Sequence, residues 1–189
     1  TKSRATRNAG KQLGRTCMCG IFGIISNQVP RPSRLRTLAA RSERRGKDSS
    51  GLVKYAGQHY EVLRSDRRLT RLLKGFSIAR SPIVMGHGRL VTNGTTDNQP
   101  VVRDGVIVIH NGIVVNADDI WRHLDATPTL GVDTEVIAAI IARHVEDTGG
   151  VDGAQTPVFE LCEGIVSCIC LVPALGKLMA FPNNGSLFS

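Results

Sequence analysis

The chain has 189 residues, of which 41% are hydrophobic and 21% are charged, a composition typical of one globular domain. Its apolar runs are too short and too interrupted to cross a bilayer, so we expect no membrane contact. The net charge of +8 is unevenly distributed, because residues 1–80 contain 19 Lys/Arg against 4 Asp/Glu whereas residues 81–189 contain 5 against 12.

The first 18 residues differ from the rest of the chain. They include five basic residues, no acidic residue and almost no large apolar side chain, so they cannot add much to a core. We interpret residues 1–18 as a basic leader or propeptide. Residues 19–189 are expected to form one ordered domain, and we leave open whether it is truncated at its C-terminal end.

The domain is predicted to contain strands in clusters with helices between them. In chain order we expect a buried strand at 21–25, a helix at 33–45, a hairpin of 51–55 and 60–63, a short basic helix at 65–74, strands at 83–85 and 106–109, helices at 117–124 and 133–146, and a hairpin of 165–172 and 177–181. The two strands at 83–85 and 106–109 each run into a polar segment with glycine, a common position for a functional site. The pattern indicates an α+β fold.

The cysteines indicate a reducing compartment. Their number, five, is odd, and the first 30 residues lack the apolar core of a secretory signal, so we expect a cytoplasmic protein. Cys168 and Cys170 alternate along an apolar strand and are predicted to be buried on the same side of it rather than to bind metal. No metal site and no organic cofactor is predicted.

Six short motifs carry the chemical signal of the sequence. They are Cys19-Gly20-Ile21-Phe22-Gly23, Arg45-Gly46-Lys47-Asp48, Gly86-His87-Gly88-Arg89, Asn98-Gln99-Pro100, His110-Asn111-Gly112 and Asp133-Thr134-Glu135. In this order they closely resemble the glutaminase domain of the class II glutamine amidotransferases, the family of glucosamine-phosphate synthase and amidophosphoribosyltransferase. The resemblance extends from Cys19 to Glu135, and the later strands fit it less distinctively.

The resemblance implies the fold of an N-terminal-nucleophile (Ntn) hydrolase, a four-layer αββα sandwich of two antiparallel sheets, with Cys19 as the nucleophile. A thiol attacks an amide poorly until it is deprotonated, and a free α-amine on the same residue, with a pKa of roughly 8, can take that proton. By resemblance, the Asn111 side chain and the Gly112 backbone N–H hold the oxyanion that forms on the glutamine amide. Loss of one such donor typically lowers the rate on the order of a hundredfold.

The resemblance also implies the groups that bind the amino-acid end of glutamine. Arg89 matches the arginine that forms a bidentate contact with the α-carboxylate, which lysine would bind less well. Asp133 matches the carboxylate that pairs with the α-ammonium. Arg45 matches an arginine beside the pocket, and Thr92 and Asn93 match the loop under the substrate.

Each of these residues also has a purely structural interpretation. Asp133 could be only a helix N-cap, and Asn111-Gly112 could be only a tight turn after a strand. Arg89 could be one surface arginine among many. His87 and His110 are expected to be structural hydrogen-bonding residues rather than bases. For any one residue the structural interpretation is favoured, whereas the ordered set favours function.

Three features differ from the family pattern. Cys19 follows 18 residues, so its nitrogen is an amide unless the leader is removed, and the chain stops at Ser189 without an acceptor domain. Leu90 stands where the family often has an aromatic residue. We therefore expect ammonia to pass to an unidentified ammonia-accepting synthase chain or domain, or to be released.

Two other functions remain open. The first is a catalytically inactive Ntn-fold structural or binding protein, whose basic residues 1–80 dock on nucleic acid or on an acidic assembly. The second is an Ntn hydrolase of a different amide. The second is less favoured, because Arg89 and Asp133 together suit a free α-amino acid such as glutamine.

Overall fold

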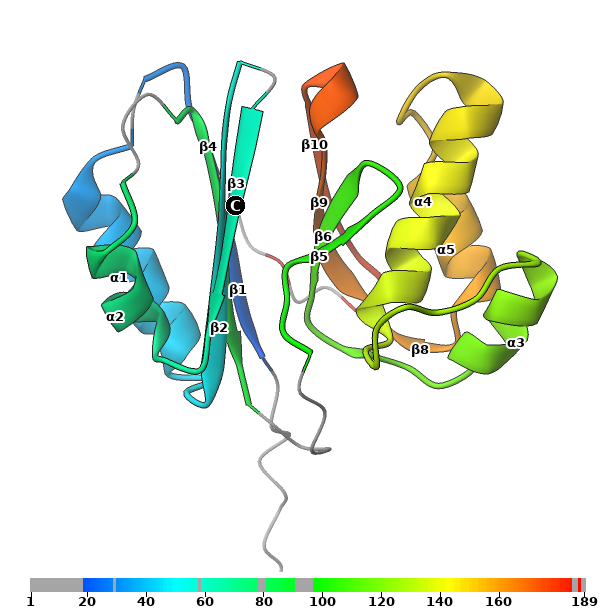
Figure 1. Ribbon diagram of the computed structural model, residues 1–189, viewed down its shortest axis with the longest axis horizontal. Helices are drawn as coiled ribbons and strands as arrows, with labels where there is room; N and C mark the ends of the chain where they lie inside the picture. The colour runs from blue at the N-terminus through cyan, green and yellow to red at the C-terminus, as the bar shows by residue number, and fades with distance from the viewer. Residues whose placement is uncertain are drawn as a thin grey trace, which may run out of the picture.

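The computed structural model describes residues 19–28, 30–57, 59–77, 81–90, 97–184 and 187. Two four-stranded antiparallel sheets pack face to face, and helices cover the outer face of each sheet (Figure 1). The layers therefore follow the order helix, sheet, sheet, helix. This arrangement confirms the predicted α+β sandwich.

The first sheet has the strand order β1-β4-β2-β3. Its strands are β1 (Gly20–Ile25), β2 (Ser49–Ala56), β3 (His59–Ser65) and β4 (Ile83–Arg89). Helices α1 (Pro32–Glu43) and α2 (Leu69–Lys74) cover its outer face (Figure 1). Proline at the first turn suits the start of α1, because its missing N–H has no partner within a helix there. Nine buried side chains, including Phe22 and Leu35, form the core between these helices and the sheet.

The second sheet has the strand order β10-β9-β6-β5. Its strands are β5 (Val101–Arg103), β6 (Val106–His110), β9 (Ser167–Val172) and β10 (Lys177–Pro182). A separate two-stranded ladder joins β7 (Ile113–Val114) to β8 (Gly164–Ile165), and a 3₁₀ turn, η1 (Pro173–Leu175), links β9 to β10.

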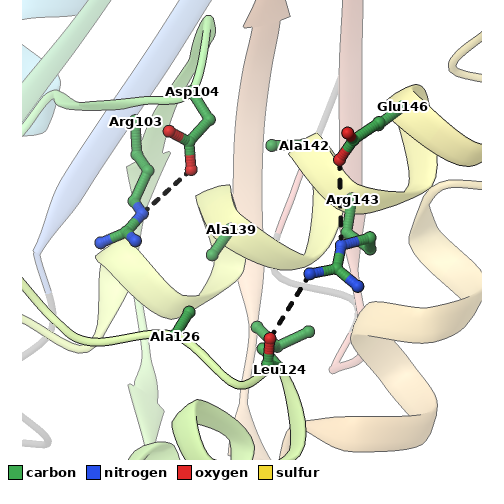
Figure 2. A pocket seen from close by; sticks show the side chains of 8 residues that line it. All are labelled: Arg103, Asp104, Leu124, Ala126, Ala139, Ala142, Arg143 and Glu146. Carbon is green, nitrogen blue, oxygen red and sulfur yellow. Dashed lines mark hydrogen bonds and ion pairs between the residues drawn. The ribbon is translucent and has the colours of Figure 1, made fainter.

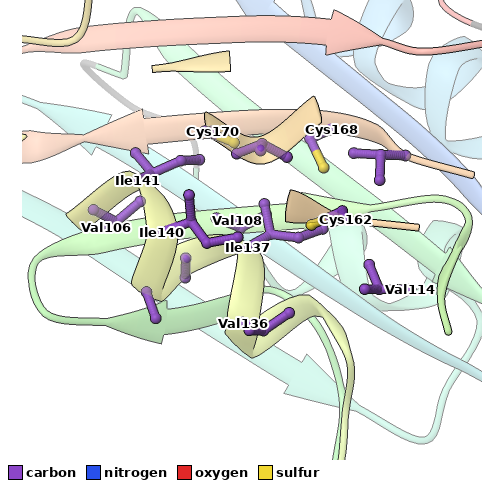
Figure 3. Close-up of a cluster of buried hydrophobic side chains, with 14 of the residues drawn as sticks. Val106, Val108, Val114, Val136, Ile137, Ile140, Ile141, Cys162, Cys168 and Cys170 are labelled. Carbon is purple, nitrogen blue, oxygen red and sulfur yellow. The ribbon is translucent and has the colours of Figure 1, made fainter. Parts of the chain in front are cut away.

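Three helices cover the second sheet, namely α3 (Ala117–His123), α4 (Thr134–Thr148) and α5 (Gln155–Leu161). They enclose a cluster of 21 buried residues, in which Ile137, Ile140 and Ile141 of α4 pack against the sheet (Figure 3). Gly149 follows the last residue of α4, and its left-handed backbone closes the last turn. A third cluster fills the space between the two sheets, with Met85 from one side and Ile109 from the other.

Most predicted elements are confirmed, with shifted ends. The basic helix begins at Leu69 rather than at residue 65, because β3 extends to Ser65. The strand expected at 83–85 continues to Arg89, so the polar motif lies within β4 rather than after it. The strand expected at 165–172 is divided between β8 and β9. The short elements β5, β7 and α5 were not predicted.

Two further expectations concern the cysteines and the membrane. Cys168 and Cys170 are both fully buried in the cluster under α4, as their alternation predicted (Figure 3). Within the described ranges, no helix combines the length and the apolar character that a membrane span requires. The proposed leader, residues 1–18, lies outside the described residues.

Candidate active site

Cys19 immediately precedes β1, at one end of the first sheet. The strand is held there by close backbone contacts: Gly20 pairs with Gly88 of β4, and a Cβ atom on Gly20 would lie 2.1 Å from the carbonyl oxygen of Ser42. A Cβ atom on Gly46 would lie 2.3 Å from the carbonyl oxygen of Gly88. Only glycine allows the end of α1 to approach the two strands so closely. The start of β1, and with it Cys19, is fixed by this packing.

The Cys19 thiol is half-buried beside charged groups of both signs. Burial raises its pKa, whereas the Leu90 backbone amide and the Arg89 guanidinium act in the opposite direction and the Asp133 carboxylate raises the pKa further. The charges of Arg89 and Asp133 thus both act on the Cys19 thiol, although the sequence placed the three residues in separate motifs. Because burial dominates, the thiol needs a base before it can act as a nucleophile.

Arg89 ends β4 and is held by the segment before β5. Its Nη1 donates to the Asp97 carbonyl oxygen and, at 3.4 Å, to Asn98 Oδ1. Asn98 is fixed in turn, since its Oδ1 accepts from Ser49 Oγ at 2.7 Å and its Nδ2 donates to Asp66 Oδ1 at 3.2 Å. Arg89 is therefore an oriented, half-buried arginine and not one surface arginine among many.

Asp133 occupies the N-cap position of α4 but does not cap the helix. Its side chain makes no capping hydrogen bond. Instead, Oδ2 accepts from the Val114 backbone N–H at 2.8 Å, and Oδ1 lies 3.9 Å from His110 Nδ1. The carboxylate is 29% exposed, so part of it can meet a ligand. The interpretation of Asp133 as only an N-cap does not fit this geometry.

Asn111 and Gly112 follow β6 and are tightly packed. Asn111 is buried, its N–H donates to the Ser167 carbonyl oxygen at 2.9 Å, and its side-chain Oδ1 has no hydrogen-bond partner among the described residues. A Cβ atom on Gly112 would lie 1.8 Å from the Ile165 carbonyl oxygen and 2.6 Å from His110 Nε2. Asn111 is therefore bonded to β9 and Gly112 is packed against β8, so the two residues are more than a tight turn.

The two buried histidines differ from each other. His110 Nε2 lies 3.0 Å from the Ile165 carbonyl oxygen, and burial lowers the pKa of His110 although Asp133 acts in the opposite direction. His87 is completely buried, and neither of its ring nitrogens has a hydrogen-bond partner within the described part of the chain. Burial lowers the pKa of His87 to about 3. The expected structural hydrogen bond is thus confirmed for His110, whereas the His110 backbone raises the pKa of His87 less than burial lowers it.

Of the remaining predicted site residues, the structure describes only Arg45. Arg45 follows α1 with an exposed side chain, which makes no ion pair or hydrogen bond in the described ranges. Thr92 and Asn93 lie outside the described residues. The Leu90 backbone amide, by contrast, borders the thiol and was not predicted as part of the site. Side-chain patterns carry no signal for such a main-chain group.

A hollow of about 390 Å³ lies beside α4, between this helix, the end of β5 and the segment after α3 (Figure 2). It is lined by Arg103, Asp104, Leu124, Ala126, Ala139, Ala142, Arg143 and Glu146. None of Cys19, Arg89 and Asp133 lines it, so the candidate site is defined by side-chain placement and not by this hollow. Among the described residues, no group of three or more His, Cys, Asp or Glu side chains is arranged to hold a metal ion.

Comparisons with known proteins support the resemblance to the class II glutamine amidotransferases that the sequence motifs indicated. No protein-family model matches the chain. It is 36% identical over 138 residues to a glutamine–fructose-6-phosphate aminotransferase of Agrobacterium fabrum, covering 69% of this chain and 22% of that protein. The corresponding protein of Rhizobium meliloti is 33% identical over 177 residues, covering 89% of this chain and 29% of the relative. The chain therefore spans less than a third of the length of these relatives.

A solved structure supports the fold. Glutamine phosphoribosylpyrophosphate amidotransferase from B. subtilis superposes with a TM-score of 0.66 at 19% sequence identity, covering 87% of this chain and 37% of that one. At this identity the likeness concerns the fold alone. Sequence and fold together make the chain a distant relative of the class II glutamine amidotransferase domains, with the Ntn fold.

Proposed function

We propose that this protein hydrolyses the side-chain amide of glutamine through a thioester on Cys19. The observation that carries the proposal is the position of the thiol beside Arg89 and Asp133, two oriented groups of opposite charge. A free α-amino acid has one carboxylate and one ammonium, which these groups match. The relatives named above are glutamine-dependent aminotransferases by name, which adds weight to glutamine as the substrate.

In the proposed reaction, the Cys19 sulfur attacks the side-chain carbonyl carbon of glutamine. The Asn111 side chain and the Gly112 N–H hold the resulting oxyanion. The C–N bond then breaks, and the nitrogen leaves as ammonia after it receives the proton that the thiol gave up. Water hydrolyses the thioester to glutamate and restores the thiol. The ammonia passes to a separate synthase chain or domain, or is released.

The base in this proposal is the α-amine of Cys19. Because burial raises the pKa of the thiol, a base with a pKa of roughly 8 on the same residue would remove the proton at neutral pH. This role requires removal of residues 1–18, so we propose that they form a leader cleaved before Cys19. Arg45, Thr92 and Asn93 remain proposed substrate contacts.

The test combines N-terminal analysis with an assay of ammonia release. We expect intact mass and Edman degradation to identify a chain that begins at Cys19, and this chain to release ammonia from glutamine. Cys19→Ala should abolish release, whereas Cys162→Ala, which removes a buried cysteine of the other sheet's core, should retain it. An intact leader without ammonia release would overturn the proposal.

A second candidate function is binding of an acidic or nucleic-acid partner by the first helical layer. Residues 31–47 and 67–74 contain eleven Lys/Arg and one acidic residue, Glu43. Between α1 and α2 lies a hollow of about 410 Å³ with an apolar floor that includes Leu35 and Phe76 and a rim that includes Arg36 and Lys74. Such a surface attracts polyanions.

Salt dependence tests this second function. Binding of a short DNA duplex should weaken with salt, and Arg36→Glu with Lys74→Glu should reduce the slope of log K against log salt by roughly 0.9 for each phosphate that the variant no longer binds. Lys177→Glu, an exposed cation on β10, is the matched control and should leave the slope unchanged. If all three substitutions changed the salt slope equally, the surface between α1 and α2 would not be a specific binding site for the polyanion.

A further inference from the structure

We propose that the buried ion pair between Arg103 and Glu135 is a positioning device for Asp133, and that it thereby determines the affinity for the α-ammonium of the substrate. The inference rests on the proposed glutaminase function and names two residues that would act on the substrate through Asp133. Arg103 ends β5, and Glu135 lies in the first turn of α4, two residues after Asp133.

Besides its ion pair with Arg103, the buried Glu135 carboxylate is hydrogen-bonded to one short segment of chain. Its side chain is 1% exposed and accepts hydrogen bonds from the Thr129 backbone N–H at 2.9 Å and from the Leu130 backbone N–H at 2.8 Å. The Thr129 hydroxyl also donates to it. These donors lower the pKa of the carboxyl against the effect of burial. The carboxylate thus ties residues 129–130 to the helix that begins after Asp133.

Arg103 completes the connection to two other elements. Its Nη1 donates to Glu135 Oε1 at 2.7 Å and to the Thr127 carbonyl oxygen at 2.9 Å. Its guanidinium stacks on the Trp121 ring of α3, with 4.8 Å to the ring centroid, and its Nε contacts Asp104 (Figure 2). The second sheet, α3 and the segment 127–130 are therefore held to the start of α4 by one planar group.

This connection determines the position of Asp133. The residue lies between the tied segment and the first turn of α4, and its carboxylate makes no capping bond that would fix it to its own helix. Its described contacts are the Val114 N–H and the more distant His110 ring. If the segment or the helix start shifts, the carboxylate shifts with it, and ligand affinity is sensitive to displacements of this size.

A buried ion pair can also serve stability alone, so the test must separate the two roles. We would measure binding by calorimetry in the full chain with Cys19→Ala, which prevents turnover. The ligands are glutamine and its deaminated analogue, 4-carbamoylbutanoate, which lacks the α-ammonium. Asp133→Asn should weaken glutamine binding and leave the analogue unchanged, which defines the effect of removing the partner of the ammonium group.

Glu135→Gln is expected to have the same effect as Asp133→Asn, namely weaker binding of glutamine but not of the deaminated analogue. It should raise the Kd for glutamine by about 10-fold, the low end of the effect of removing a supporting group, and change the Kd for the analogue less than about 2-fold. Arg103→Lys keeps the charge but not the planar fork, and should give the same pattern to a smaller extent. Glu146→Gln is the matched control, because this exposed residue lies on the same helix and pairs only with Arg143 among the described residues.

Each outcome decides the question. Equal weakening of both ligands in Glu135→Gln, or no weakening of either, would overturn the positioning role while leaving the glutaminase proposal intact. Failure of the Cys19→Ala parent to bind glutamine would overturn both proposals together. If Glu135→Gln does not fold, as judged by circular dichroism, the selectivity of Arg103→Lys decides.

Discussion

The two outer helical layers of the sandwich differ in charge. In the first layer, residues 31–47 and 67–74 contain eleven Lys/Arg and one Glu, whereas residues 116–163, which include α3, α4 and α5, contain ten Asp/Glu and two Arg. The candidate site repeats this division, because Arg89 comes from the first sheet and Asp133 from the second half. Each half of the fold therefore supplies the proposed substrate-binding residue of its own sign.

The layers also differ in their cores. Nine buried residues lie beneath α1 and α2, and 21 lie beneath α3, α4 and α5. Apolar burial stabilises a segment roughly in proportion to its area. We therefore expect the second half to be the more stable support and the first half to be the more easily opened, although Cys19 belongs to the first.

The largest expected effect is that of Gly112→Ala in the second half. The new Cβ atom would meet the Ile165 carbonyl oxygen at 1.8 Å, so the segment between β6 and β7 must move away from β8. We expect a loss of about 4 kcal/mol in the free energy of unfolding. Gly150→Ala has no atom within 4 Å of its Cβ and is the control. Urea denaturation measures both, and a small loss in Gly112→Ala would show that the junction is loose.

The charge division itself is tested by Arg89→Met and Asp133→Asn. Each removes one charge-assisted interaction worth about 1.5–3 kcal/mol, so kcat/KM for glutamine should fall about 10- to 150-fold in each variant. Arg89→Met should discriminate less against glutamine whose α-carboxylate is amidated, and Asp133→Asn less against the deaminated analogue. If both variants lose the same discrimination, the two halves do not bind separate ends of the substrate.

The burial of His87 in the first sheet predicts that the free energy of unfolding depends on pH, an effect of intermediate size. Since its folded pKa is lowered to about 3, the unfolded chain takes up the proton first, with a pKa of about 6.5. The stability that His87 contributes is complete above that value and is lost progressively as the pH falls towards 3. Between pH 7.5 and 5 the loss is about 2 kcal/mol.

The matched variant is His87→Leu, which should remove that part of the acid sensitivity and change stability at pH 7.5 by less than about 1.5 kcal/mol. His110 is still present in this variant, so any acid sensitivity that remains can come from it. Burial lowers the pKa of His110 as well, but the Asp133 carboxylate raises it. Urea titrations at the two pH values measure the difference. An unchanged pH dependence in His87→Leu would assign the acid sensitivity elsewhere.

The smallest expected effect is a difference in hydrogen exchange. Amides of α4 should exchange only through global unfolding, whereas those of α1 should exchange through local opening that costs less by at least about 1 kcal/mol. Mass spectrometry of peptides from the two helices measures the difference under native conditions. Equal protection would mean that the smaller core is sufficient to make the two halves one cooperative unit.

The sequence was most informative where periodicity is long and apolar. Helix α4 directs its apolar face into one core, and β9 alternates between that core and the one between the sheets, so the type of both elements and the burial of Cys168 and Cys170 could be predicted. Elements of two or three residues, such as β5 and β7, were missed because so few positions carry no periodicity. They depend on partners that are distant in sequence.

The candidate site was predictable as residues but not as geometry. The motifs indicated Cys19, Arg89 and Asp133, whereas the contact of Asp133 with the Val114 N–H depends on a strand that periodicity does not reveal. The chain position of Glu135, within a quoted motif, gave no indication of its partner Arg103, which lies 32 residues away. Long-range polar contacts follow from the fold, not from local patterns.

The opposite charges of the outer layers give the molecule an electric dipole moment directed across the sandwich. In the field of a polyanion the dipole turns the first helical layer inward, and near a cationic surface it turns the second layer inward. Cys19 precedes an edge strand and lies at the rim of the sheet, on neither outer face. Either orientation leaves the rim facing sideways, so attachment by one face would not cover the end of the sheet at which Cys19 lies.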